Sequence, residues 1–138
     1  MDMIQSTGSF RVNYPSVLRA AAVSGALAVI LGAFGAHALE GQLSLKRAAT
    51  YETASQYHFY HTLLLVGLAL MPRGKWVRYA QIACGWGLVI FCGTLYVLAT
   101  RGLIGLESAG WLGAITPIGG VGFILAWGLM AVAAVGRS

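Results

Sequence analysis

Long apolar runs, separated by short segments with charged residues, glycine or proline, make up most of the chain. Three runs, residues 17–39, 77–100 and 111–135, reach the roughly 20 residues that a helix needs to cross the hydrocarbon of a bilayer. The remaining run, residues 57–71, is shorter, but residues 45–56 lack glycine and proline and extend it into one helix, with Ser44 as its N-cap. The pattern predicts an all-α membrane protein, a four-transmembrane-helix bundle with helices at residues 17–39, 45–71, 77–100 and 111–135.

The connections divide the chain into a polar N-terminal tail, residues 1–15, and one transmembrane domain, residues 16–136. Pro72-Arg73-Gly74-Lys75 ends the second helix, because proline and glycine continue a helix only at a cost. Residues 101–110 separate the third helix from the fourth. A signal peptide cleaved after Ala36-His37-Ala38 is the alternative for the first run, but its long N-terminal region and long apolar stretch favour a membrane span.

The composition supports a membrane environment. Of 138 residues, 58% are hydrophobic and only 9% are charged, whereas soluble domains carry about a quarter charged residues. The net charge of +5 could indicate nucleic-acid binding. Here the cations stand singly at the ends of apolar runs, without a basic stripe interleaved with aromatic residues, so no nucleic-acid partner is expected.

The charges predict the orientation of the helices. With four spans, both termini and the loop at residues 72–76 share one side, which holds six cations and one acid; the other side holds three of each. Because cytoplasmic loops carry the excess of lysine and arginine, both termini are expected in the cytoplasm of a bacterial inner membrane, or in the mitochondrial matrix. The first side carries Arg11, Arg19, Arg73, Lys75, Arg78, Arg137 and Asp2, and the second Lys46, Arg47, Arg101, Glu40, Glu52 and Glu107.

In this orientation the polar side chains of all four helices fall in the outer half of the membrane. They predict a pocket that binds a ligand or a proton, since ionisable groups inside membranes are expensive and tend to be functional. Its candidate residues are His37, His58, His61, Tyr96 and Thr116.

The three histidines, His37, His58 and His61, are also the candidate metal ligands, because imidazole binds zinc, copper and haem iron. Metal sites in bundles draw ligands from facing helices, and the third and fourth helices contain no histidine, which weakens this reading. The alternative is that the histidines hydrogen-bond to neighbouring hydroxyls and carbonyls. No cofactor is expected. Tyr51, at the start of the second helix, is expected to face polar surroundings at the membrane interface.

Small residues predict close contacts between helices, because they let membrane helices approach each other. Pro117 predicts a kink in the fourth helix. Cys84 and Cys92 are eight residues apart, about 12 Å along one helix, so they are expected to be buried thiols rather than a disulfide. The packing glycines are Gly25, Gly32, Gly35, Gly93, Gly119 and Gly120.

Four motifs in order resemble the domain of unknown function 423 family, a YgdD-like group of small inner-membrane proteins with relatives in animal mitochondria. The resemblance covers residues 17–135 and implies a four-helix inner-membrane protein; the family carries no established activity. The motifs are Gly32-Ala33-Phe34-Gly35-Ala36-His37, Thr53-Ala54-Ser55-Gln56-Tyr57-His58-Phe59-Tyr60-His61, Cys92-Gly93-Thr94-Leu95-Tyr96 and Thr116-Pro117-Ile118-Gly119-Gly120.

No enzyme is expected, because the chain lacks a nucleophile constellation, a phosphate-binding loop and a dinucleotide fingerprint. The first functional hypothesis is a structural or accessory subunit that packs against a larger membrane complex. The alternative is a homo-oligomeric binding or transport protein that uses the His/Tyr/Thr pocket. The expected partners are the lipid bilayer and either another membrane protein or further copies of the chain.

Overall fold

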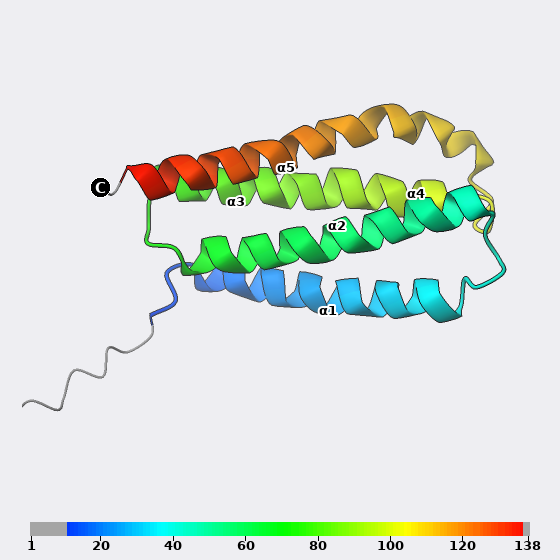
Figure 1. The fold of residues 1–138 in the computed structure, drawn as a ribbon, viewed down its shortest axis with the longest axis horizontal. Coiled ribbons are helices and arrows are strands. Elements are labelled where there is room, and N and C mark those ends of the chain that lie inside the picture. The colour runs from blue at the N-terminus through cyan, green and yellow to red at the C-terminus, as the bar shows by residue number, and fades with distance from the viewer. Residues whose placement is uncertain (1–10, 137–138) are drawn as a thin grey trace, which may run out of the picture.

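The structure, a computed structural model, describes residues 11–136, which form helices and no β-strand (Figure 1). Three continuous helical segments, Pro15–His37, Lys75–Thr100 and Glu107–Val135, are long and apolar enough to cross a membrane. The prediction of an all-α fold is therefore confirmed. The elements are α1 (Pro15–His37), α2 (Leu45–Leu70), α3 (Lys75–Gly87), a π-helical turn (Leu88–Cys92), α4 (Gly93–Thr100), a 3-10 turn (Glu107–Trp111) and α5 (Leu112–Val135).

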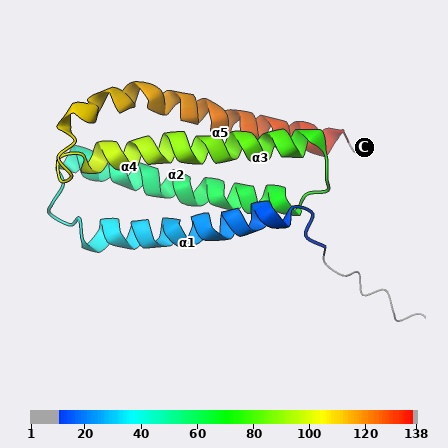
Figure 2. The ribbon, with the colours of Figure 1, turned by 180° about the vertical axis from the view of Figure 1, so that it is seen from behind.

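The helices form two antiparallel pairs that lie side by side (Figures 1 and 2). In one pair α1 packs along α2, and in the other α5 packs along the continuous rod of α3, the π-helical turn and α4. α2 joins the pairs because it also contacts α3 and α4. We call the end at which α1 begins and α5 ends the basic end, and the opposite end the mixed-charge end.

The first turn of α2 has the predicted cap. The Ser44 hydroxyl accepts a hydrogen bond from the backbone N–H of Arg47 at 3.4 Å, which satisfies one of the free donors at the start of a helix. α2 has 26 residues and is about 39 Å long. It is not among the three segments that are apolar enough to cross a membrane, and its polar side chains His58, His61 and Thr62 are buried between its neighbours.

The last turn of α2 is closed by the segments that flank it in space. Pro72 has no N–H, so the carbonyl of Leu68 loses its usual helical partner. The Gln81 side chain of α3 donates to it instead, at 3.0 Å. All four final carbonyls find donors in this way: the donors are Met71 N for Gly67, Gln81 Nε2 for Leu68, Tyr14 N for Ala69 and Asn13 Nδ2 for Leu70.

Residues 11–14, predicted to belong to the polar tail, therefore include part of this cap. Arg73 strengthens the junction, because its Nε donates to the Asn13 carbonyl at 3.0 Å and its guanidinium lies 5.6 Å from the centre of the Tyr14 ring. Pro15 then occupies the first turn of α1, where a missing N–H costs nothing. Asp2 and Arg137, which the sequence analysis assigned to the cytoplasmic side, lie outside the described residues, as do the other residues of segment 1–10.

Glycines set the spacing between α1 and α2. A Cβ at Gly25 would lie 3.4 Å from the Thr62 methyl, and one at Gly32 would lie 3.2 Å from Ser55 Oγ. A Cβ at Gly35 would overlap the ring of Tyr51. The expectation that Tyr51 faces polar surroundings is therefore corrected: its ring is buried over Gly35, and its hydroxyl donates to the Leu31 carbonyl at 2.7 Å.

Between α5 and the α3–α4 rod the closest approach lies at Gly119, where a Cβ would overlap the backbone of Phe91. Gly120 is in ordinary contact with the Phe91 ring. Gly122 also lies here, and a Cβ at this position would be 3.0 Å from the Ala83 carbonyl. The predicted packing role of Gly93 is corrected, because a Cβ there would meet nothing within 4 Å.

Candidate functional site

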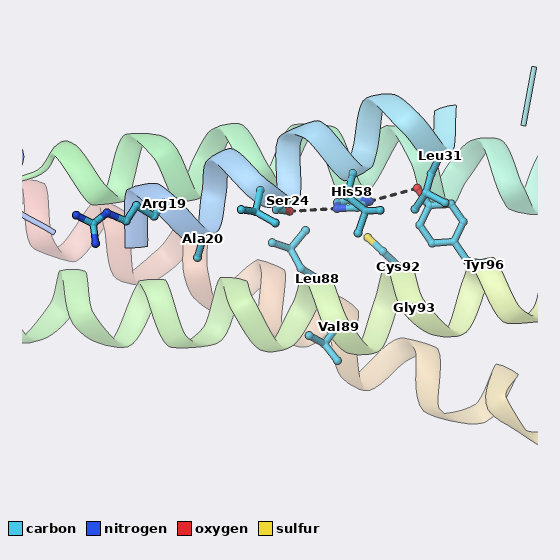
Figure 3. Close-up of a pocket in the computed structure, with 12 residues that line it drawn as sticks. Arg19, Ala20, Ser24, Leu31, His58, Leu88, Val89, Cys92, Gly93 and Tyr96 are labelled. Atoms are coloured by element: carbon cyan, nitrogen blue, oxygen red, sulfur yellow. Dashed lines mark hydrogen bonds between the residues drawn. The ribbon is translucent and has the colours of Figure 1, made fainter. Parts of the chain in front are cut away.

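The principal candidate site is a groove that runs along one side of the bundle between α1 and α4, which do not pack closely together in the described part of the chain (Figure 3). α2 forms its floor. The groove has a volume of about 670 Å³, within the range of about 300–1,000 Å³ that is usual for ligand sites. We call it groove one, and it is lined by Arg19, Ala20, Val23, Ser24, Leu27, Leu31, His58, Leu88, Val89, Cys92, Gly93 and Tyr96.

A chain of four hydrogen-bonding side chains crosses the floor of groove one, with His58 between Ser24 and Tyr96 (Figure 3). His58 Nε2 lies 3.1 Å from Ser24 Oγ, and His58 Nδ1 lies 3.3 Å from the Tyr96 hydroxyl. Ser24 Oγ in turn lies 2.7 Å from Thr62 Oγ1. Each polar group thus has a partner, as a polar group in an apolar interior requires.

The hydrogens of this chain have two consistent arrangements. In the first, His58 Nε2–H donates to Ser24, Ser24 donates to Thr62, and Tyr96 donates to His58 Nδ1. In the second, every bond is reversed, with the other tautomer of the ring. In both arrangements the Ser24 oxygen donates one hydrogen, accepts one and keeps a lone pair. The floor therefore offers a hydrogen-bond acceptor to a group that enters the groove.

His61 faces a second groove, of about 680 Å³, between α2 and α5. Its Nδ1–H donates to the Tyr57 carbonyl at 2.9 Å, which leaves Nε2 to accept from Trp127 Nε1–H at 3.4 Å. The ring stacks on Phe123, with the ring centres 3.5 Å apart. We call this groove two, and it is lined by Tyr57, Tyr60, His61, Phe91, Pro117, Gly120, Val121, Phe123, Ile124 and Trp127.

The three predicted metal ligands do not come together. His37 is exposed at the end of α1, and His58 and His61 face different grooves. No group of three histidine, cysteine, aspartate or glutamate side chains within residues 11–136 is placed to hold a metal ion. The H-x-x-H spacing placed both rings on one helix, but positions three residues apart point about 60° apart around the helix axis, and this turns the two rings toward different grooves.

The predicted depth of the histidines is also corrected. His58 follows the first residue of α2, Leu45, by 13 positions and precedes the last, Leu70, by 12, so it lies at the middle of the helix rather than in its outer half. His61 lies nearly one turn further toward the basic end. The sequence estimate counted depth from residue 57, whereas α2 begins twelve residues earlier.

Thr116 does not belong to groove one. It is buried, its hydroxyl lies 2.8 Å from the Thr94 hydroxyl, and it contacts the Leu112 carbonyl at 3.1 Å. Thr94 Oγ1 also lies 2.7 Å from the Ile90 carbonyl in the π-helical turn. The threonine pair therefore links two irregular places, the π-helical turn and the first turns of α5, which contain Pro117. The α5 ribbon is curved (Figure 1).

The sequence analysis did not select Ser24 or Arg19 for the site. Ser24 interrupts the first apolar run one residue before Gly25, which could have indicated that its hydroxyl faces α2. Arg19 lines groove one, five residues and about 8 Å from Ser24 toward the basic end.

The two ends of the bundle differ in charge. At the mixed-charge end Glu107 pairs with Arg47 at 3.1 Å and with Arg101 at 3.7 Å.

Comparisons with known proteins find relatives over most of the chain. A family model described as a protein of unknown function (DUF423) matches residues 31–120. The UPF0382 membrane protein YwdK of Bacillus subtilis is 42% identical over 118 residues, which cover 83% of this chain and 91% of the relative. The UPF0382 membrane protein SERP0230 of Staphylococcus epidermidis is 43% identical, covering 81% of this chain and 88% of that protein.

The UPF0382 inner membrane protein YgdD of Escherichia coli K12 is 36% identical over 83% of this chain and 86% of its own length. No solved structure matches the chain. The resemblance found in the four sequence motifs is confirmed, and the chain belongs to the DUF423 family of membrane proteins.

Proposed function

We propose that the chain crosses a bacterial inner membrane four times, with both termini in the cytoplasm. α2 lies beside three helices that are apolar enough to span, and it is long enough for the roughly 30 Å of hydrocarbon. Its polar side chains His58, His61 and Thr62 are buried against its neighbours, which removes the cost of exposing them to lipid. A reporter fused at Ser138 should face the cytoplasm. A fusion that faces outward would contradict this topology.

Within that topology, the protein acts as a binding protein for a membrane-soluble amphiphile, which lies in groove one. The observation that carries this proposal is the His58 chain on the floor of a groove whose walls are apolar. Inside the bilayer, a chain of hydrogen-bonded polar side chains stabilises the fold little more than apolar side chains would. Its position at an open groove therefore favours a role in recognition.

The groove fits such a ligand in two ways. Its walls, which include Val23, Leu27 and Val89, suit a hydrocarbon chain. The spare lone pair of Ser24 suits a hydroxyl or amide group on the same molecule. One chain supplies every lining residue, so binding does not depend on the predicted homo-oligomer. We assign the groove no catalytic step.

The direct test is native mass spectrometry of the protein released gently from its own membrane. We expect the wild type to retain a lipid-sized mass. Gly93→Leu should lose that mass, because the new side chain meets open space and extends into groove one. Gly128→Leu is the matched control, since a Cβ at this exposed position on α5 also meets nothing within 4 Å and it does not line groove one. Equal retention by both variants would contradict the proposal.

His58→Phe tests whether the hydrogen-bonded chain, rather than the volume of groove one, selects the ligand. The ring keeps a similar shape but leaves neither nitrogen for Ser24 or Tyr96. We expect a changed selection among lipids with and without hydroxyl or amide groups, while retention of lipid as such persists. Unchanged selectivity would show that the hydrogen-bonded chain plays no part in recognition.

An accessory role in a larger membrane complex is the second candidate, and the exposure of α1 favours it. Within residues 11–136, α2 is the one helix against which α1 packs closely, and Val23, Val29 and Ile30 are 61–71% exposed. A helix of another membrane protein could cover this face. Extra protein subunits in the same mass spectrum, lost after Ile30→Arg, would support this role over lipid binding.

A further inference from the structure

We infer that the occupant of groove one is an anionic lipid of the leaflet at the basic end, with its headgroup at Arg19 and one hydrocarbon chain in the groove. This inference rests on the proposed binding function and names the ligand class. Its evidence is the position of Arg19, the distribution of charge between the two ends of the bundle, and the order of side chains along the groove.

Arg19 is an exposed cation that lines the basic-end part of the groove. Figure 3 shows its side chain directed along the groove away from Ser24, toward the basic end. A long arginine side chain within the first turns of a membrane helix places its charge near the interface while its stem follows the apolar surface. A phosphate at that level is an anion within reach of the guanidinium.

A second cation, Arg78 on α3, also lies toward the basic end. Val89 lines groove one, and Arg78 stands eleven residues earlier, which is three turns of helix with a net rotation of about 20°. Arg78 therefore continues the groove-facing side of the α3–α4 rod toward the basic end.

Charge complementarity selects an anion rather than a zwitterion. Among the described residues, the basic end carries five cations and no acid. The mixed-charge end carries three cations and three acids, with Glu107 paired to two arginines. Basic sites between membrane helices on the cytoplasmic side are typical binding sites for anionic lipid headgroups. The five cations are Arg11, Arg19, Arg73, Lys75 and Arg78.

The rest of the groove matches the remainder of such a lipid. Beyond Arg19, Val23 and Leu27 of α1 face Leu88 across an apolar channel that leads past the His58 chain. Ser24 lies about 8 Å deeper than Arg19. A hydroxyl or amide near the headgroup could therefore reach the spare lone pair of Ser24, while the hydrocarbon chain continues toward Leu31.

The test uses full-length protein reconstituted in nanodiscs of equimolar phosphatidylglycerol and phosphatidylcholine with identical acyl chains, followed by native mass spectrometry of the lipid retained after release. We expect the wild type to retain phosphatidylglycerol about fivefold over phosphatidylcholine, the ratio for one favourable cation near the membrane surface. Arg19→Gln should bring the ratio near one without reducing total retention, and Arg19→Lys should restore it.

Arg11→Gln is the matched control, because it removes the same charge at the same end from a residue that does not line groove one. Its ratio should equal that of the wild type. Equal retention of both lipids by the wild type, or equal ratios for Arg19→Gln and Arg11→Gln, would overturn the inference while leaving groove binding intact. Absence of any retained lipid, or retention unaffected by Gly93→Leu, would instead refute the proposed binding function itself.

Discussion

His58 and His61 stand three residues apart on the same helix, yet they have opposite surroundings. The donor and acceptor roles of the two His61 nitrogens are fixed, because one donates to a backbone carbonyl and the other accepts from Trp127. The His61 ring is also stacked on Phe123. His58 belongs to a chain of hydroxyls that can reverse as a whole. The same residue type is therefore structural in groove two and adaptable in groove one.

The helix contacts behind the two grooves differ in the same sense. Behind groove two the α5 backbone touches the π-helical turn at Gly119, so this position tolerates no added atom. In groove one Gly93 faces open space. The two grooves have similar volumes, about 670 and 680 Å³, but a close helix contact lies behind groove two, and groove one has an open position at Gly93. The difference teaches that adaptable hydrogen bonds, rather than the presence of a histidine or the volume of a groove, mark the candidate site.

The largest expected effect on stability comes from adding one methyl group behind groove two, compared with one added in groove one. Gly119→Ala should lower the free energy of unfolding by about 3 kcal/mol, because its Cβ overlaps the Phe91 backbone and α5 must shift. Gly93→Ala should raise it by about 0.5–1 kcal/mol, since alanine is the better helix former and meets no neighbour. Unfolding in mixed micelles measures both. Similar effects at the two glycines would remove the contrast between the grooves.

A double-mutant cycle sharpens the assignment of His61. His61→Phe keeps the stack on Phe123 but leaves the Trp127 N–H without its acceptor, at an expected cost of about 1–3 kcal/mol. In a Trp127→Phe background the same substitution should cost about 1 kcal/mol less, because that donor is already absent. Additive effects would show that the His61–Trp127 bond does not hold the ring.

Tyr96→Phe tests the reversibility of the His58 chain. Removing the hydroxyl leaves His58 Nδ1 without its side-chain partner, while Ser24 and Thr62 stay paired. We expect a loss of about 1 kcal/mol and a single preferred ring tautomer, which nitrogen-15 NMR of labelled His58 reports. An unchanged mixture of tautomers would mean that the tyrosine does not bias the chain.

The smallest effect is expected at the mixed-charge end, away from both grooves. Glu107→Gln removes ion pairs with Arg47 and Arg101 at a partly exposed site, so the loss of stability should stay below about 1 kcal/mol and shrink further in high salt. A loss of several kcal/mol would indicate that this ion cluster, rather than packing along α2, holds the two helix pairs together.

The architecture could be predicted because apolar runs, proline and glycine act locally. The Ser44 cap and the end of α2 at Pro72 follow from neighbouring residues alone. The site depends instead on the rotation and depth of each helix. The sequence could not show that Tyr51 packs on Gly35, that His58 and His61 line different grooves, or that Thr116 pairs with Thr94. Ser24 was missed because its partners belong to α2, 34 and 38 residues away.

The most direct test of the central claim is labelling with a lipid whose acyl chain carries a photoreactive diazirine, followed by mass-spectrometric mapping of the labelled residues. The account predicts that label concentrates on Val23, Leu27 and Val89 in groove one and falls there after Gly93→Leu. Labelling of Val132 on α5, which is similarly exposed but outside both grooves, should stay constant. Label spread over all exposed apolar residues in proportion to their exposure, and unchanged by Gly93→Leu, would contradict the account.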